Sequence, residues 1–234
     1  TADLVLFVLS VFEIDQYDRL AEELYNNKIR LDTEPPSISV TKRHTGGLKV
    51  TTAKGIDLDE ATIKEVCREY GYVNADITIQ QNLDIDELVD ALMDNRVYLP
   101  SAVAVNKADL IEPDYLDTVN ADLRDRGIDP DDAVFISAEE EKGLDALKEK
   151  IFDSLGLIRI YMDKPGRGVD YDEPLVITED ENTVEDVLDK LGGDFDERFR
   201  FGRVSGESAK HDEQQVGRTH ELADEDVLRI VARK

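Results

Sequence analysis

The sequence has few cysteines, no tryptophan and no long apolar run. Cys67 is its single cysteine, so the chain can form no internal disulfide. Helical spacing places Cys67 beside Ile63, Val66 and Tyr70, which predicts a buried structural thiol rather than a nucleophile. No stretch approaches the roughly 18 apolar residues of a membrane span, and no basic and apolar leader is present. We therefore expect a cytoplasmic protein with no membrane partner.

Basic residues are also scarce, with 28 Lys and Arg against 54 Asp and Glu, a formal net charge of −26. Residues 157–234 hold 20 acidic and 12 basic residues, a net of −8, which leaves −18 for residues 1–156. The acidic charge is therefore spread evenly, which normally disfavours nucleic-acid partners. An even acidic coat is typical of proteins that work in molar salt, where charge repulsion is screened, so we hypothesise a halophilic source. His44, His211 and His220 are scattered and predict no metal site.

What the sequence does contain is a buried strand followed by a polar motif. Ala102-Val103-Ala104-Val105 leads into Asn106-Lys107-Ala108-Asp109 at the carboxyl end of the strand, where open α/β sheets bind ligands. An aspartate at this position can accept hydrogen bonds from N1–H and the exocyclic amine of guanine, which adenine does not offer. Asparagine can bridge the base and the neighbouring loops, and the lysine stem can lie along the ring.

A second strand-and-loop element follows after a helix-sized gap. Ala133-Val134-Phe135-Ile136 ends in Ser137-Ala138, where a backbone N–H can meet O6 of guanine. Three fixed residue types recur by chance about three times per hundred chains of this size, and the strand in front of each motif lowers that frequency. The alternative is two strand ends followed by ordinary polar loops.

The order of the elements predicts an α/β protein with an inserted block. Strands at 4–9, 98–106 and 133–136 alternate with helices at 13–26, around 116–123 and at 144–155, which is typical of a parallel sheet. A β-β-α-β-α block interrupts this alternation. It consists of strands at 37–40 and 48–52 around a Gly46-Gly47 hairpin turn, a helix at 58–70, a strand at 75–80 and a helix capped by Asp84 with Glu87.

After Leu157 the pattern changes to short strands around one helix, which suits a β-grasp fold. The strands lie at 158–161, 175–177, 199–204 and 227–231, with a turn at 165–168, and Thr183 caps the helix. Two places are locally basic: Lys42, Arg43 and Lys49 in the insert, and Arg198, Arg200, Arg203 and Lys210 in the terminal block. Each is either an RNA or ribosome contact or a solvated face of charged side chains.

Several segments resemble the developmentally regulated GTP-binding proteins of the Obg-like GTPases. They are Asn95-Arg96-Val97-Tyr98-Leu99-Pro100 leading into Asn106-Lys107-Ala108-Asp109, Pro35-Pro36-Ser37-Ile38, Tyr161-Met162-Asp163-Lys164-Pro165-Gly166, Val216-Gly217-Arg218-Thr219-His220 and Glu225-Asp226-Val227. The resemblance implies the C-terminal half of a P-loop-type GTPase domain (1–31 and 97–156), a ribosomal-S5-domain-2-like insert (32–96) and a TGS domain (157–234). It also implies GTP or GDP as ligand, GTPase activity, and the ribosome or RNA as a partner through the TGS domain.

The sequence lacks the motifs with which this family binds the nucleotide phosphates. It contains no G-x-x-x-x-G-K-[ST] segment and no switch threonine for Mg²⁺, and no D-x-x-G precedes the first strand. The resemblance therefore assigns Asn106, Lys107, Asp109, Ser137 and Ala138 as guanine contacts and no catalytic or metal-binding residue. We expect an N-terminally truncated chain that is inactive alone, with hydrolysis and Mg²⁺ binding in the intact protein.

Two other function classes account for parts of this sequence. One is a short adaptor that binds RNA or protein and retains a vestigial nucleotide pocket. The other is an enzyme with paired carboxylates, which the even spread of Asp and Glu disfavours. An upstream phosphate-binding segment in the same reading frame would distinguish the GTPase from the adaptor.

Overall fold

The computed structural model describes residues 2–164, 166–193 and 195–232. The chain divides into two compact units, Thr1–Ala133 (unit 1) and Val134–Lys234 (unit 2). Among the described residues, no helix has both the length and the apolar content needed to span a bilayer. In the same part of the chain, no three His, Cys, Asp or Glu side chains gather in a way that could hold a metal ion.

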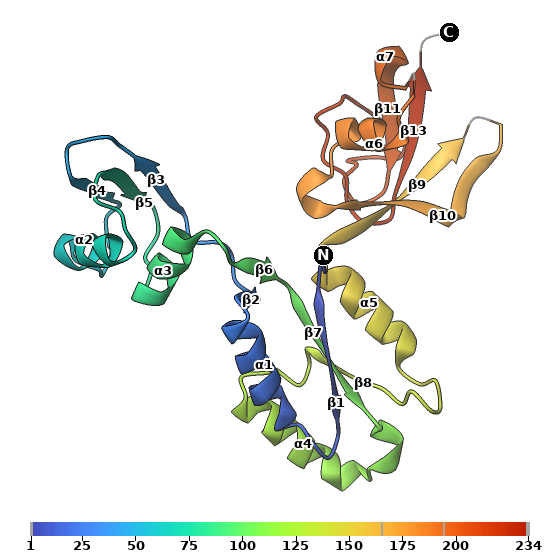
Figure 1. Ribbon diagram of the computed structural model, residues 1–234. Helices are drawn as coiled ribbons and strands as arrows, with labels where there is room; N and C mark the ends of the chain where they lie inside the picture. The colour runs from blue at the N-terminus through green and yellow to red at the C-terminus, as the bar shows by residue number, and fades with distance from the viewer. Residues whose placement is uncertain (1, 165, 194, 233–234) are drawn as a thin grey trace. The chain divides into compact units, whose positions relative to one another are not determined.

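A short parallel sheet forms the centre of unit 1 (Figure 1). β1 (Val5–Ser10) pairs in parallel with β7 (Ser101–Asn106), so that Ser10 lies opposite Asn106. β8 (Ala133–Phe135) completes the sheet in the order β1-β7-β8. Every residue from Ala102 to Val105 is buried, which explains why this strand is continuously apolar. The predicted parallel α/β arrangement is confirmed.

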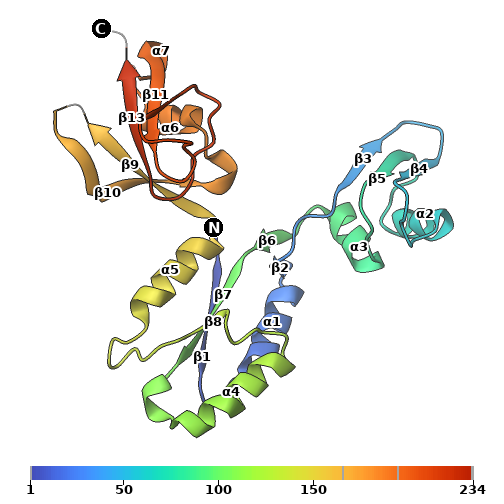
Figure 2. The same ribbon diagram turned by 180° about the vertical axis from the view of Figure 1, so that it is seen from behind.

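Two helices of unit 1, α1 (Gln16–Asn26) and α4 (Pro113–Asp125), lie side by side (Figures 1 and 2). Arg126 and Asp18 form an ion pair of 3.2 Å between the helices. β1 is an edge strand, and together with α1 it borders an apolar groove of about 470 Å³. α1 begins three residues later than predicted because Val11 and Ile14 are buried in the turn that follows β1.

The inserted block is an α+β fold with its own core. It contains β3 (Ile38–Lys42), β4 (Leu48–Thr52), α2 (Glu60–Glu69), β5 (Ala75–Ile79) and α3 (Ile85–Met93). The predicted hairpin of the first two strands is wrong: the sheet order is β3-β5-β4, with β5 antiparallel to β3 and parallel to β4. The reason is burial. β5 contributes Ala75, Ile77 and Ile79, each at most 1% exposed, so the most apolar strand takes the centre.

A two-stranded parallel ribbon, not predicted from the sequence, carries the insert. β2 (Ile29–Leu31) leads into the insert and β6 (Val97–Leu99) leads out of it, with Ile29 opposite Val97. After β2, the Asp32 carboxylate accepts hydrogen bonds from the backbone N and the Oγ of Ser101, at 2.7 and 2.6 Å. The ribbon therefore leads directly into β7.

Unit 2 begins in β8, continues through α5 (Leu144–Ser154) and ends in a five-stranded sheet of order β10-β9-β13-β11-β12. The strands are β9 (Leu157–Lys164), β10 (Gly168–Thr178), β11 (Phe199–Ser205), β12 (Gln214–Val216) and β13 (Asp226–Ala232). Pro165, in the turn predicted between β9 and β10, lies outside the described residues. The sequence analysis missed β12, which has only three residues.

The helix α6 (Val184–Leu191) lies to one side of β11 and β13 (Figure 1). Val184, Val187 and Leu188 are fully buried there against strand residues such as Ile160 and Leu228. Thr183 caps α6, as the sequence predicts, and the structure adds that it forms a capping box with Asp186. The short helix α7 (Phe195–Arg198) precedes β11.

Candidate functional site

The Asn106–Asp109 motif forms a tight turn at the carboxyl end of β7. The Asn106 carbonyl accepts a hydrogen bond from the Val11 backbone N at 3.0 Å, which ties the end of β7 to the loop after β1. The Asn106 side chain accepts from the Lys107 backbone N at 2.8 Å. The asparagine side chain therefore holds the backbone of its own loop.

Lys107 has a left-handed backbone, with φ 68° and ψ 32°. This conformation is uncommon for a residue with a Cβ and is found where the surrounding structure imposes it, often at functional sites. Here it turns the chain sharply out of β7 into the 3₁₀ turn η1 (Ala108–Leu110), which the Leu110 N to Lys107 O hydrogen bond closes at 3.1 Å. As a result, the side chains of Lys107 and Asp109 are both exposed directly beyond the end of the strand.

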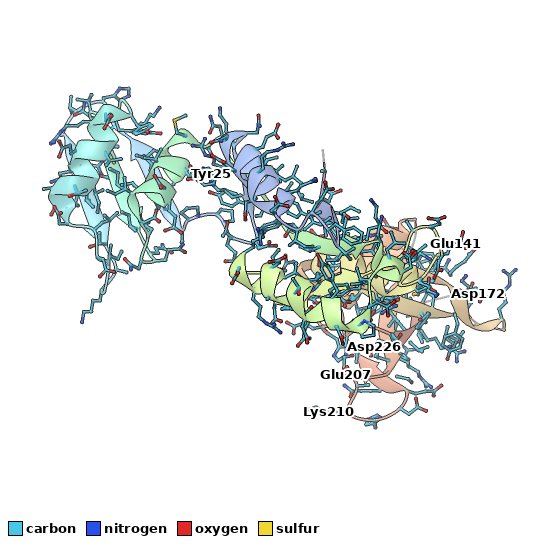
Figure 3. All side chains as sticks on the ribbon, turned by 90° about the horizontal axis from the view of Figure 1, so that it is seen from below. Tyr25, Glu141, Asp172, Glu207, Lys210 and Asp226 are labelled. Atoms are coloured by element: carbon cyan, nitrogen blue, oxygen red, sulfur yellow. The ribbon has the colours of Figure 1, made fainter. Side chains whose placement is uncertain are left out.

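The second predicted element, Ser137-Ala138, lies in unit 2 in an equally constrained loop. The backbones of Ser137 and Lys142 exchange two hydrogen bonds of 3.0 Å, and Ser137 Oγ accepts from Glu140 N at 3.1 Å. Ser137 is 2% exposed, whereas Ala138 lies at the surface. Figure 3 labels Glu141 in this loop.

Gly143 makes this loop geometry possible. Its φ is +74°, and a Cβ at this position would lie 2.4 Å from the Phe135 carbonyl oxygen. No other residue fits without moving the backbone, so the glycine fixes how closely the loop returns to β8 before α5 begins. The loop is therefore preformed, and the backbone of Ala138 has a defined direction.

The structure brings Asn106, Lys107 and Asp109 together in unit 1, and Ser137 and Ala138 together in unit 2. The first group offers the exposed carboxylate of Asp109, the positively charged side chain of Lys107 and the hydrogen-bonded side-chain amide of Asn106. The second offers a rigid backbone segment. These are groups that recognise a polar planar ligand edge, and none of them is an obvious general acid, general base or nucleophile.

The sequence analysis missed several polar residues that the fold brings together. Asp90, Arg30 and Arg96 form a buried ion cluster in unit 1. In unit 2 the carboxylate of Asp226, which is fully buried, accepts from Ser208 Oγ, and Ser208 Oγ lies 3.0 Å from His220 Nε2. All of these contacts except Arg96–Asp90 span 12 or more residues, so no local sequence pattern predicts them.

Two protein-family models match this chain. Residues 45–157 match the family described as the C-terminal region of the MMR_HSR1 domain. Residues 158–232 match the TGS domain. The structure and these matches together define a GTPase-like α/β protein that ends in a TGS domain.

Three curated relatives, all named GTP-binding proteins, indicate the family to which the chain belongs. An uncharacterized GTP-binding protein of Halobacterium salinarum is 62% identical over 233 residues, which is 100% of this chain and 63% of the relative. An uncharacterized GTP-binding protein of Methanocaldococcus jannaschii is 39% identical over 100% of this chain and 59% of the relative. The developmentally-regulated GTP-binding protein 1 of Xenopus laevis is 36% identical over 99% of this chain and 61% of the relative.

The chain belongs to the family of developmentally regulated GTP-binding proteins. It spans about three fifths of the length of these relatives.

Proposed function

We propose that this chain is the guanine-recognising part of a GTP-binding protein. In this proposal Asp109 accepts hydrogen bonds from N1–H and the exocyclic amine of guanine. The Lys107 stem lies along the base, Asn106 holds the loop, and the Ser137-Ala138 loop directs a backbone N–H to O6. The observation that carries the proposal is the left-handed turn at Lys107, which leaves Asp109 exposed at the carboxyl end of a buried parallel strand.

Each motif lies at the carboxyl end of a strand, Asn106–Asp109 after β7 and Ser137-Ala138 after β8, which is where open α/β sheets bind ligands. The names of the relatives support the ligand, since those proteins are named GTP-binding. An exposed carboxylate that is matched to two donors on one base edge discriminates guanine from adenine, because adenine leaves the carboxylate without partners.

Phosphate binding and hydrolysis require groups that this sequence lacks. Phosphoryl transfer depends on a phosphate cradle, a metal ion and a positioned water, and no phosphate-loop motif occurs in the 234 residues. We therefore propose that GTP hydrolysis and Mg²⁺ belong to the full reading frame that encodes this chain, and that the chain alone is inactive. We further propose that the protein works in the cytoplasm of a halophile and that its TGS domain contacts the ribosome or RNA.

The test of guanine recognition is Asp109→Asn in the protein from the full reading frame, with Asp114→Asn as the matched control. Asp114 is an exposed aspartate in the first turn of α4. An amide donates where the carboxylate accepted, so GDP affinity should fall roughly 10- to 100-fold while the affinity for xanthosine diphosphate rises. Fluorescent analogues of both nucleotides report the two affinities. Equal GDP binding by the two variants would remove Asp109 from the base site.

The second candidate function is the short adaptor with a vestigial pocket. It is favoured if the full reading frame adds no phosphate-loop segment and if the wild-type protein binds neither GDP nor GTP. In that case the TGS domain and the insert carry the function.

A further inference from the structure

We infer that one face of the insert binds double-stranded RNA through its phosphate backbone. This binding is independent of guanine recognition and of the contacts proposed for the TGS domain. The segment that carries it is 35–56, which forms β3, β4 and the loop between them. It contains four Lys and Arg and not one Asp or Glu, although acidic residues make up 54 of the 234 in the chain. Segment 35–56 is the longest acid-free run in the sequence.

Strand structure alone does not explain the lack of acids in this segment. β9 and β10 are also partly exposed, and they contain Asp163, Asp170, Asp172 and Glu173. Exposed strand positions of this chain therefore ordinarily include acidic residues, in keeping with its net charge of −26. A basic surface on such an acidic protein attracts polyanions, which is the electrostatic requirement for binding a phosphate backbone.

The alternation of side chains assigns the two faces of the insert sheet. On β5, Ile77 and Ile79 are buried in a core with residues of α2 and α3, so Asp76 and Thr78 point to the other side. The apolar residues of β3 and β4 pack against the same core. We call the side away from the helices the outer face of the insert. Its strand residues are Ser39, Thr41, Lys49, Thr51, Asp76 and Thr78.

The strand register arranges the outer face in two rows, Ser39-Thr78-Thr51 and Thr41-Asp76-Lys49. The first row consists of hydroxyl groups, and neither row contains an aromatic or a large apolar side chain. Single-stranded nucleic acids stack their bases on aromatic side chains, which these rows do not supply. Duplex RNA instead offers phosphates and 2′-hydroxyl groups across a wide, shallow minor groove. A flat face of hydroxyl groups with cations at its end is complementary to that groove.

The cations on the outer face are not neutralised by neighbouring acids. Asp76 forms an ion pair with Arg43 through Oδ2, and its buried Oδ1 has no hydrogen-bond partner among the described residues. No described carboxylate forms an ion pair with Lys49, which is exposed. The Arg43 side chain is 53% exposed, so it keeps N–H donors for a phosphate. Arg43 and Lys49 thus give the outer face a net positive charge. At the end of β3, Lys42 adds a third cation, 5.0 Å from the centre of the Tyr72 ring.

The loop 43–47 adds backbone donors beside these cations. Asn74 accepts from the first and the last backbone N–H of this loop, through its carbonyl at 2.9 Å and its Oδ1 at 2.8 Å. Gly46 and Gly47 have φ values of +110° and +74°, and a Cβ on either would contact nothing within 4 Å, so their backbone is open. Within the described part of the chain, no group accepts from the backbone N–H of residues 44–46. Consecutive unpaired N–H groups in a glycine-containing loop are suited to clamp backbone phosphates.

The test measures binding of a labelled RNA duplex to the full chain by fluorescence anisotropy. The duplex has about 20 base pairs, which is more than the roughly 16 that a double-stranded-RNA-binding domain spans. The KCl concentration is the lowest at which circular dichroism shows a folded protein. The double variant Arg43→Gln, Lys49→Gln is compared with Lys28→Gln, Arg68→Gln, which also removes one exposed lysine and one exposed arginine. Both variants therefore have the same net charge.

The outer-face variant should bind the duplex at least about tenfold more weakly than wild type, because charge-assisted contacts to two phosphates are lost. The slope of log affinity against log salt should also fall by about 2. The control variant should bind like wild type, since Lys28 and Arg68 lie outside the outer face.

RNA duplex should bind more tightly than single-stranded RNA or than DNA duplex of the same sequence. Three results would overturn the assignment: no binding by the wild-type chain, equal binding of single-stranded RNA or duplex DNA, or equal losses in the two double variants. GDP binding is measured on the same preparations, so that a failure at the insert leaves the guanine proposal standing and the reverse also holds. RNA binding that resides in the TGS domain alone would survive in the outer-face variant and so count against the insert.

Discussion

At the residue scale, Asp90 is the charged side chain on which the attachment of the insert depends. It lies near the end of α3, and its carboxylate accepts from Arg30 Nε and Arg96 Nε, both at 2.6 Å. The three side chains are only 7–13% exposed. Arg30 also lies 3.7 Å over the ring of Tyr25, at the end of α1. The Asp90 carboxylate thus links α3 of the insert to Arg30 of β2, and Arg30 in turn contacts Tyr25 of α1.

Removing this carboxylate should be costly, because it would leave two buried guanidinium groups without their counterion. Asp90→Ala is expected to lower the free energy of unfolding by about 3–5 kcal/mol. The control is Asp86→Asn, an exposed acid in the first turn of the same helix, which should change it by at most about 0.5 kcal/mol. Urea unfolding at fixed salt measures both. If Asp90→Ala proves as stable as the control, the ion cluster does not hold the insert.

Local residue features were predictable and distant ones were not. The capping box of Asp84 with Glu87 and the cap at Thr183 were both predicted from the sequence. Cys67 is fully buried as expected, and burial raises the pKa of its thiol, which keeps it unreactive. In contrast, Arg30 and Asp90 are 60 residues apart, and no periodicity connects them.

At the element scale, α5 is attached to the TGS sheet through one side chain. Arg159 on β9 donates from Nε and Nη2 to Asp224, at 3.1 and 2.6 Å, and lies 3.3 Å from Glu149 on α5. Its guanidinium also lies 4.7 Å from the centre of the Phe152 ring on α5. The helix that follows the Ser137-Ala138 loop is therefore held to the first strand of the TGS domain.

This attachment should depend on pH. The hydrogen bonds from Arg159 lower the pKa of Asp224 from its usual 3.8. Because the folded pKa lies below the unfolded one, the stabilisation is complete above about pH 4 and disappears as the pH falls through the folded pKa. Asp224→Asn should therefore be less stable than wild type at pH 6 and approach it as the pH falls below 3.8.

Thermal melts across this range measure the difference, with Asp212→Asn, in an exposed loop of the same domain, as the control for general acid titration. A constant gap between wild type and Asp224→Asn at every pH would contradict the assignment.

Strand order shows why parts of the fold escaped prediction. Alternating residues located β3, β4 and β5, but pairing depends on which strand buries most surface, and local sequence does not report that. The Gly46-Gly47 turn suggested a hairpin, yet β5 lies between the two strands. The three-residue strands β2 and β12 went undetected, and the strand predicted at 98–106 is two strands, β6 and β7, separated at Pro100.

The edge strand β10 shows another feature that only the structure reveals. Pro174 lies in its irregular region, and Lys190 of α6 donates to the Val176 carbonyl at 2.6 Å. Both features occupy or remove backbone groups that could pair with another chain. These two features reduce the number of backbone groups along β10 that could pair with an added strand.

At the scale of the whole molecule, the charge of −26 decides how the fold responds to salt. The ion pairs of the described residues are mostly exposed at one or both partners and contribute little each, so they do not offset the general repulsion. The Debye length falls from about 10 Å at 0.1 M salt to about 3 Å at 1 M. Salt therefore stabilises this chain mainly by screening like charges.

We expect the melting temperature to rise by at least about 10 °C between 0.1 M and 2 M KCl, which corresponds to a few kcal/mol in a chain of this size. Salt also strengthens apolar burial, so the screening part needs its own control. Replacing three exposed acids on α1 and α4, in the variant Glu22→Gln, Asp117→Asn, Asp125→Asn, should raise the melting temperature at 0.1 M and change it little at 2 M. If these substitutions act equally at both salt concentrations, repulsion is not what salt relieves, and the acidic coat has another role.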